Sequence, residues 1–194
     1  MESFTKIKRK LRRKTVGIAG AGGLGSNCAV ALARVGIGKL IICDFDKVTR
    51  ANLNRQYYFN EQIGQQKVFA LADNIFFIDP YVKVLPKNIK LSPANIKESF
   101  KSCDVIVEAF DKAEMKEMLI ETVLDEMPEK PLVVGLGMAG WGKNEIIKSR
   151  NIDNLFICGD EETEISPELP PLAPRVGIVA NMQANQVLEL LLNQ

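Results

Sequence analysis

The feature that most constrains how this chain folds is a glycine-rich run, Gly20-Ala21-Gly22-Gly23-Leu24-Gly25. The apolar segment 15–20 has the character of a buried strand, and residues 24–35 repeat apolar side chains at helical spacing. Glycines between a strand and a helix allow a tight turn and let a ligand approach the backbone closely. Because the start of a helix also carries unpaired N–H groups and a positive dipole, this run predicts a turn that binds phosphate.

An acidic pair follows the next strand. The apolar segment 39–43 reads as a second buried strand, and Asp44 and Asp46 come directly after it. Asp44 stands 24 residues after Gly20, at the point where a carboxylate can accept hydrogen bonds from both hydroxyls of a ribose. The turn and Asp44 together predict a site for an adenosine-containing ligand.

The alternation of strands and helices continues along the chain. The patterns predict the following later elements: a helix over 63–78 ended by Pro80, a strand over 81–85, a helix over 92–100, a strand over 104–109, a helix over about 112–126 and a strand over 132–134. From residue 135 the regularity stops, and we expect a short strand near 145–148, a loop over 160–174 and a closing helix over about 176–192. The fold class predicted is α/β, a Rossmann-like doubly wound sheet that is mostly parallel, with helices on both faces and a short irregular C-terminal part.

Length and charge favour one domain that recognises its partners locally. We expect a single domain over 1–194, made of a basic leader (1–14), a nucleotide-binding core (15–134) and a C-terminal part (135–194). With 25 basic and 24 acidic side chains, the total charge gives no reason to expect nucleic-acid or membrane binding. The start lacks a long apolar segment and no apolar run suffices to span a membrane, so we expect a cytoplasmic protein.

Cysteine and histidine usage narrows the chemistry. The four cysteines are far apart and form no C-x-x-C pair, so we expect reduced thiols and no zinc site. Cys28, Cys43 and Cys103 fall in an expected helix and two expected strands, where a cysteine is usually a small core residue. The chain has no histidine, which removes the commonest general base and the usual nucleophile pairs. Any chemistry must use carboxylates, cations, backbone amides or a thiol.

The glycine turn alone does not choose between NAD and ATP, since both contain a ribose and bridged phosphates. ATP carries more negative charge and calls for added cations and usually a magnesium ion. Arg55 follows the second strand, Lys67 lies in the first turns of the next helix, and Asp111 follows the fourth strand. In a doubly wound sheet these positions meet at the edge that carries the glycine turn. The sequence therefore favours Mg²⁺-ATP, with Asp111 as the metal ligand.

Five segments together carry a family resemblance: residues 20–26, 44–48, 52–56, 63–67 and 172–178. Their sequences and order resemble the ThiF/MoeB/HesA superfamily, which adenylates ubiquitin-like sulfur carriers and includes the ubiquitin-activating enzymes. The short form of the chain, with Cys158-Gly159-Asp160 before the last loop, most resembles the compact second ThiF family associated with thiamine biosynthesis. The zinc-binding C-x-x-C pairs of larger relatives are missing here.

The resemblance implies a role for each matching residue. Asp44 would bind the ribose beside Asp46, Gln56 would shape the phosphate pocket, and Asp111 would hold magnesium. The implied phosphate contacts are Gly20, Gly22, Gly23, Leu24, Gly25, Asn52, Arg55 and Lys67. The implied reaction is attack of the carrier's C-terminal glycine carboxylate on the α-phosphate of ATP, which releases pyrophosphate and leaves an acyl-adenylate. That nucleophile is already an anion at neutral pH, so the reaction needs no histidine.

The resemblance also implies partners. These are a ThiS-like sulfur carrier that ends in Gly-Gly, a second copy of the chain in a homodimer, and possibly a sulfur donor protein. Cys158 is implied as the thiol that links to the carrier, and residues 161–174 as a loop that covers the carrier's tail. In residues 6–14, seven of nine side chains are basic. We favour a solvated helix face for them over a role across a dimer.

Two rival interpretations stay open. One is a scaffold that binds nucleotide or carrier without catalysis, and the other is an NAD(P)-dependent oxidoreductase on the same sheet. The oxidoreductase would leave Arg55, Lys67 and Asp111 without a shared purpose. The identity of the carrier, its pathway and the sulfur donor also stay open.

Overall fold

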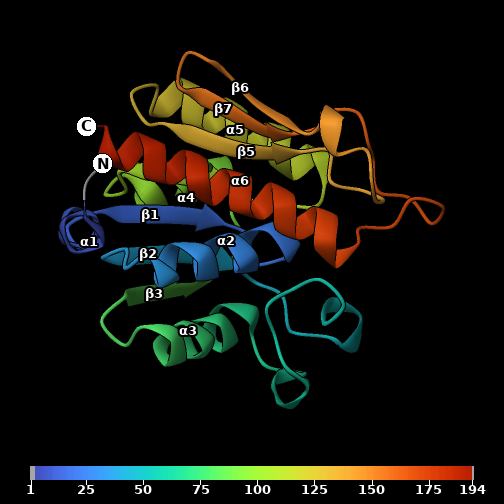
Figure 1. Cartoon of the computed structure of the whole chain (residues 1–194), viewed down its shortest axis with the longest axis horizontal. Coiled ribbons are helices and arrows are strands. Elements are labelled where there is room, and N and C mark those ends of the chain that lie inside the picture. Colours follow the sequence, from blue (N-terminus) through green and yellow to red (C-terminus); the bar gives the residue numbers. More distant parts are fainter. Residues whose placement is uncertain (1–2, 194) are drawn as a thin grey trace.

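The computed structural model describes residues 3–193 and is built on one seven-stranded sheet (Figure 1). The strands lie in the order β3-β2-β1-β4-β5-β7-β6. Their bounds are β1 Thr15–Ala19, β2 Lys39–Asp44, β3 Lys83–Asn88, β4 Val105–Glu108, β5 Leu132–Leu136, β6 Lys148–Ile152 and β7 Leu155–Gly159. All neighbours pair in parallel except β6, which runs antiparallel to β7. The order reverses between β1 and β4, and such a switch point opens a crevice at the carboxyl ends of the strands.

Helices cover both faces of the sheet (Figure 1). Their bounds are α1 Phe4–Leu11, α2 Gly23–Arg34, α3 Lys67–Ile78, α4 Pro93–Phe100, α5 Ala113–Glu126 and α6 Ala173–Leu192. Helices α2, α3 and α6 pack in one apolar cluster with alternate side chains of the central strands, such as Val16 and Ile18. Helices α4 and α5 pack in the other with the opposite side chains, such as Ala19 and Ile106. The predicted doubly wound α/β fold is confirmed.

Two element boundaries differ from the sequence-based prediction for reasons of turn chemistry. Helix α3 begins at Lys67 and not at Ile63, because a short 3₁₀ turn at Asn60–Gln62 precedes it and Gly64 has a φ of 90°. Strand β3 begins at Lys83 and not at residue 81. The residues before it form a turn in which the Asp79 carboxylate accepts a hydrogen bond from the Tyr81 N–H (3.0 Å).

The C-terminal part is more regular than predicted. Residues 144–146 form a 3₁₀ turn, and β6 and β7 extend the sheet beyond β5. Leu155 to Cys158 is an apolar run after the turn residues Asp153 and Asn154, which is a strand signal that our prediction missed. The closing helix α6 is confirmed, with Pro174 in its first turn, where no backbone N–H is needed.

The basic leader is an ordered helix that docks on the fold. Leu11 of α1 is fully buried, and Ser3 is the N-cap of α1, with its hydroxyl oxygen accepting a hydrogen bond from the Lys6 N–H. The Lys8 Nζ (3.1 Å) and an Arg12 Nη (2.9 Å) both contact one carboxylate oxygen of Asp79, the residue that ends α3. Part of the leader's charge therefore holds two helices together.

Cys103 lies in the turn between α4 and β4 and not in a strand as predicted, although it is buried. Among residues 3–193, none of the helices combines the length and the apolar character that a membrane crossing requires.

Candidate nucleotide-binding site

The glycine turn links β1 to α2 and depends on its glycines. Gly20 has a φ of 102°, and a Cβ there would lie 2.8 Å from the carbonyl oxygen of Ala109 on the neighbouring strand connection. A Cβ on Gly25 would overlap the carbonyl oxygen of Gly20. Gly22 occupies the N-cap of α2 and has no side chain to cap the helix. The first amides of α2 are thus left for a ligand, as expected of a phosphate-binding turn.

Asp44 is held in a fixed orientation at the end of β2. One carboxylate oxygen accepts from the Ala21 N–H (2.7 Å) and the other from the Asp46 N–H (2.7 Å). Each oxygen keeps a lone pair for a further donor. Asp44 therefore joins the glycine turn to the second strand and can still accept hydrogen bonds from a ribose.

Lys67 and Arg55 reach the same place from different elements. Lys67 begins α3, is 6% exposed, and its Nζ lies 2.9 Å from a carboxylate oxygen of Asp46. Arg55 donates from Nη1 to the Ala51 carbonyl (3.1 Å) and to the Asn54 side chain (2.8 Å). Both cations are therefore positioned in advance, and phosphate oxygens would compete with their present partners.

A cleft opens at the carboxyl ends of the strands, and Gln56 and Asn52 differ in their access to it. Gln56 lines it, and its side-chain Oε1 is buried with no hydrogen-bond partner among residues 3–193. Asn52 does not line the cleft. Its side-chain oxygen instead accepts from the Thr49 N–H (2.9 Å) and caps a 3₁₀ turn, Arg50–Asn52. The structure thus gives Asn52 a role in shaping the loop that carries Arg55.

Asp111 lines the cleft and follows β4, which flanks β1 on the side away from β2 and Asp44. It is exposed and makes no hydrogen bond or ion pair with any residue of 3–193. Just before it, Glu108 is fully buried and accepts from the Phe110 N–H (2.6 Å) and from the Lys116 Nζ (2.8 Å). Burial raises the pKa of Glu108, and the Lys116 ammonium opposes that rise. Since Lys116 also donates to the Gly135 carbonyl (2.9 Å), this pair anchors the loop that carries Asp111 to α5 and β5.

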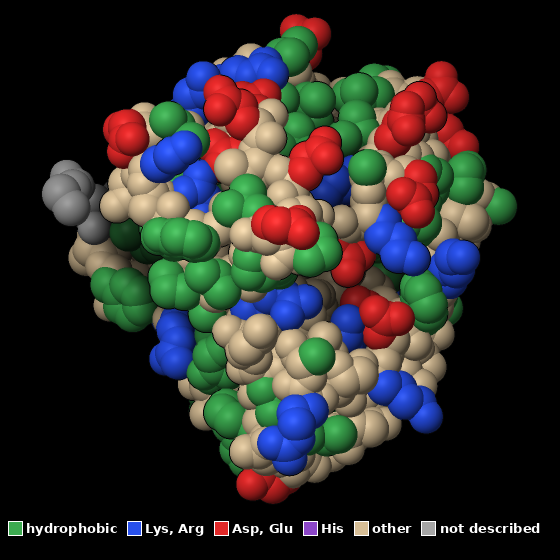
Figure 2. All heavy atoms as spheres, turned by 90° about the vertical axis from the view of Figure 1, so that its right-hand side faces the viewer, with side chains coloured by type: hydrophobic (Ala, Val, Ile, Leu, Met, Phe, Trp, Pro, Cys, Tyr) green, Lys and Arg blue, Asp and Glu red, His purple; other side chains and the backbone are tan. Residues whose placement is uncertain are grey.

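A single cleft of about 530 Å³ lies at the carboxyl ends of the strands, and it is lined by the glycine turn, Asp44, Asp46, Arg55, Gln56, Lys67 and Asp111. Figure 2 shows this face of the molecule, with a hollow near its centre that is bordered by both basic and acidic side chains. The apolar residues that line the cleft are Leu24, Phe45, Ile89, Leu91, Ala109, Phe110, Met115, Met138, Ile165, Pro171 and Val176. A cleft of this size, with apolar walls and a few fixed polar groups, suits a ligand the size of a nucleotide.

Sequence reasoning missed several residues that line or support the cleft. Lys90 and Lys112 line it. They follow β3 and β4, so the rule that parallel strands end at one edge could have found them. The buried Tyr58 hydroxyl donates to the Ala21 carbonyl (2.7 Å) and ties the glycine turn to the loop after β2. The Ser26 hydroxyl does the same from α2, accepting from the Tyr57 N–H (3.0 Å). No local sequence pattern predicts these last two contacts, because they join residues 37 and 31 positions apart.

One wall of the cleft comes from the C-terminal part and is held by a buried ion pair. Arg175 in the first turn of α6 pairs with Asp160 and donates to the Gly142 carbonyl (2.5 Å). Burial alone would raise the pKa of Asp160, but hydrogen bonds from Thr163, Glu162 and Arg175 lower it to about 2. The pair joins three segments of the C-terminal part beside the cleft.

Cys158 lies away from solvent. It is 0% exposed on β7, in the apolar cluster of α2 and α6, and burial raises its pKa to about 12. A thiol with that pKa is scarcely ionised at neutral pH. In this conformation Cys158 is a core residue, and the geometry does not bring it to the cleft.

The residues present fit ATP and magnesium. Four cations line the cleft, Arg55, Lys67, Lys90 and Lys112, and they would face a triphosphate. Magnesium in such sites commonly takes one or two carboxylates together with phosphate oxygens, and Asp111 could supply such a carboxylate. Fold and cleft define a nucleotide-binding α/β domain whose cleft lies at the switch point of the sheet.

Comparison with known proteins gives the family. The model of the ThiF family matches residues 3–194, and the chain belongs to that family. Ubiquitin-like modifier-activating enzyme 5 of Caenorhabditis elegans is 30% identical over 175 residues, which cover 87% of this chain and 40% of that protein. Adenylyltransferase and sulfurtransferase MOCS3 of Caenorhabditis briggsae is 29% identical over 191 residues, which cover 94% of this chain and 47% of that protein. The chain thus spans less than half of either curated relative.

The fold is shared with solved structures. The E. coli tRNA N6-threonylcarbamoyladenosine dehydratase TcdA, in complex with ATP, superposes with a TM-score of 0.87 at 20% identity, covering 97% of this chain and 89% of that one. E. coli MccB, solved with a MccA variant, superposes with a TM-score of 0.73 at 19% identity, covering 96% and 59%. The resemblance noted in the sequence, to the superfamily of ubiquitin-activating enzymes and MoeB, is confirmed.

Proposed function

We propose that the chain uses Mg²⁺-ATP to adenylate the C-terminal glycine carboxylate of a small ubiquitin-like carrier protein. The observation that carries the proposal is that Arg55, Lys67 and Asp111, which lie on three separate elements, line one cleft together with the glycine turn and Asp44. An NAD(P) site would need only the turn and Asp44, and would leave these three charged groups without a task.

The reaction we propose relies on alignment and on neutralisation of charge. Asp44 would hold the ribose, and the first amides of α2 would donate to the phosphates. Lys67 and Arg55 would offset the charge that moves onto the departing pyrophosphate. When bound at Asp111, magnesium would add to this neutralisation. No proton needs to be removed from the nucleophile, because a carboxylate is ionised at neutral pH.

The carrier's tail would enter past the C-terminal part. Met138, Ile165 and Pro171 line the cleft from that side. The Gly140 N–H donates to the Pro170 carbonyl (3.0 Å), so the loop before α6 lies against the turn after β5. We propose that residues 135–194 form the channel for a Gly-Gly tail. The Arg175–Asp160 pair would hold the walls of this channel in fixed positions relative to one another.

The finer assignment concerns the carrier and the assembly. We propose a ThiS-like sulfur carrier of thiamine biosynthesis, based on the short form of the chain and on Cys158-Gly159-Asp160 before the last loop. We also propose that the protein works as a homodimer in the cytoplasm. Because Cys158 is buried, we propose that adenylation itself proceeds without its thiol.

Mass spectrometry of the carrier tests this function. The protein, Mg²⁺-ATP and a ThiS-like carrier should yield a carrier adenylate, and a carrier that lacks its terminal Gly-Gly should yield none. The Cys158→Ser variant should form the adenylate at the wild-type rate. ATP binding without adenylate on any Gly-Gly carrier would favour the scaffold instead. NADH binding without ATP binding would favour the oxidoreductase.

A further inference from the structure

A second cavity lies at the opposite edge of the sheet, where β1, β2 and β3 begin. Its volume is about 400 Å³, and five of the eight residues that line it are basic while none is acidic. Those five are Arg12, Arg13, Lys14, Lys39 and Lys83. The chain brings them together because the parallel strands start at one edge: Lys39 begins β2 and Lys83 begins β3 beside it.

Within residues 3–193, two of these five cations pair with a carboxylate and three do not. Arg12 pairs with Asp79 and Lys14 with Asp104 (3.6 Å). Within residues 3–193, no carboxylate lies at ion-pair distance from the other three cations of the cavity. The Arg12 Nη1 is also buried without an acceptor in the described chain. Like charges held together repel one another, so a bound anion would relieve a cost built into the fold.

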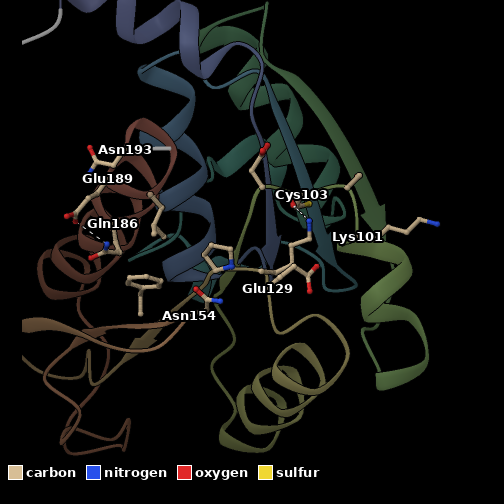
Figure 3. Close-up of a pocket in the computed structure, with 13 residues that line it drawn as sticks. Lys101, Cys103, Glu129, Asn154, Gln186, Glu189 and Asn193 are labelled. Atoms are coloured by element: carbon tan, nitrogen blue, oxygen red, sulfur yellow. Dashed lines mark hydrogen bonds between the residues drawn. The ribbon is translucent and has the colours of Figure 1, made fainter.

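The charge is particular to this cavity. The neighbouring hollow at the same edge has a volume of about 680 Å³ and is mixed in charge, as Figure 3 shows: Glu129 and Glu189 border it as well as Lys101. The whole chain has 25 basic and 24 acidic residues, so its average surface is nearly neutral. The excess of basic over acidic side chains is therefore a local feature of this cavity.

Tyr81 adds a flat aromatic face at the rim. Its side chain is 77% exposed although it lines the cavity, and the Arg12 guanidinium lies 5.5 Å from its ring centroid. Cations beside an exposed aromatic ring are the combination that binds a phosphate and stacks the group attached to it.

We propose that this cavity binds a phosphate ester, with the phosphate facing Arg13, Lys39 and Lys83 and the attached group against Tyr81. The site is separate from the nucleotide cleft, since Lys39 and Asp44 stand at opposite ends of β2, about 16 Å apart along a strand of that length. Two sources share this chemistry, a free phosphate compound and a single-stranded nucleic acid.

Amide chemical shifts in NMR can separate this site from the nucleotide cleft in the intact chain. Inorganic pyrophosphate should shift the amides of Gly38 and Lys83 in a saturable manner, whatever it does at Gly22 and Gly23. The double variant Lys39→Gln, Lys83→Gln should weaken that binding by at least about tenfold, because two charge-assisted contacts are lost. The control, Lys101→Gln on the same edge, should leave it unchanged.

Thermal unfolding gives a second readout that does not depend on activity. Pyrophosphate should raise the melting temperature of the wild type through this site, and the double variant should lose most of that rise. Without the anion the double variant should be as stable as the wild type or more stable, because two repelling charges are gone.

Comparing two probes distinguishes a free phosphate compound from a single-stranded nucleic acid as the ligand. A ten-nucleotide RNA that shifts the same amides more tightly than pyrophosphate identifies a nucleic-acid strand, whereas pyrophosphate binding alone identifies a small phosphate ligand. The proposal is wrong if Gly38 and Lys83 do not respond to either probe, or if the double variant binds as tightly as the wild type. It is also wrong if only anionic vesicles bind, since the surface would then be a membrane contact.

Discussion

At the scale of single residues, the nucleotide cleft contains charged groups of two kinds. Asp44, Asp46 and Lys67 are already engaged with protein partners, which fixes where they point. Asp111 is exposed and has no partner among residues 3–193. A carboxylate that the fold itself does not use is the group whose removal should affect function and leave stability alone.

Asp111→Asn should therefore separate the two effects. We expect its free energy of unfolding to stay within about 0.5 kcal/mol of the wild type, because no contact is lost. We expect adenylate formation to fall by a factor of about 100 and to need more magnesium, because a neutral amide holds the ion poorly. Rates measured across a magnesium titration, together with urea unfolding, check both expectations. Unchanged rates at every magnesium concentration would exclude Asp111 as the metal ligand.

Asp160 should show the opposite behaviour. In the folded chain its pKa is about 2, below its ordinary value of 3.8, so its ionised form stabilises the fold above about pH 4. That contribution is lost as the pH falls towards 2. Asp160→Asn leaves Arg175 without its buried partner and should cost about 3 kcal/mol at pH 7.

The difference in unfolding free energy between wild type and Asp160→Asn should narrow between about pH 4 and pH 2. Urea unfolding at a series of pH values measures this difference. The control is Glu164→Gln, because Glu164 lies in the same loop but is exposed. A difference that stays constant with pH would show that the Asp160 charge does not stabilise the fold.

At the scale of elements, the site is made where β1 turns into α2 and where the loop after β2 folds back onto that turn. The turn needs glycine for steric reasons, and the loop is tied down by Ser26, Asn27 and Tyr58. Function at this scale depends on backbone geometry, so it should respond to the smallest side-chain change.

Gly25→Ala tests the turn. The new methyl group would overlap the carbonyl oxygen of Gly20, so the turn must open and the N-terminus of α2 must shift. We expect the variant to be destabilised and ATP affinity to fall at least about tenfold. Gly177→Ala in α6 is the matched control, because a Cβ there meets nothing within 4 Å and alanine favours the helix by about 1 kcal/mol. Isothermal titration measures the affinity of both variants for ATP. Equal affinities of Gly25→Ala and Gly177→Ala would contradict the steric role of Gly25.

The elements also show what the sequence can and cannot predict. The strand, glycine turn, helix and following acid are local patterns, so the core of the fold and the position of Asp44 could be predicted. The contacts of Tyr58 and Lys116 depend on packing between distant segments, and no spacing rule reveals them. Asn52 and Cys158 were assigned by resemblance alone. Their burial and partners depend on three-dimensional packing, and the structure gives Asn52 a capping role and Cys158 a place in the core.

At the scale of the whole molecule, the sheet separates two charged regions. Its carboxyl edge carries the nucleotide cleft, and its amino edge carries the second cavity, which is lined by five basic residues. The chain corresponds to less than half of either curated relative compared above, so the ThiF-family fold is the part that they share. We therefore propose only one step for this domain, the activation of a carboxylate by ATP at the cleft.

Exchange of labelled pyrophosphate into ATP tests that step most directly, because only a reversible adenylation returns label to the nucleotide. Our account predicts exchange that requires magnesium and a carrier ending in Gly-Gly, and that is lost in Arg55→Ala and Asp111→Asn. Exchange without any carrier, or exchange at the wild-type rate in both variants, would contradict it. So would the absence of exchange with every Gly-Gly carrier.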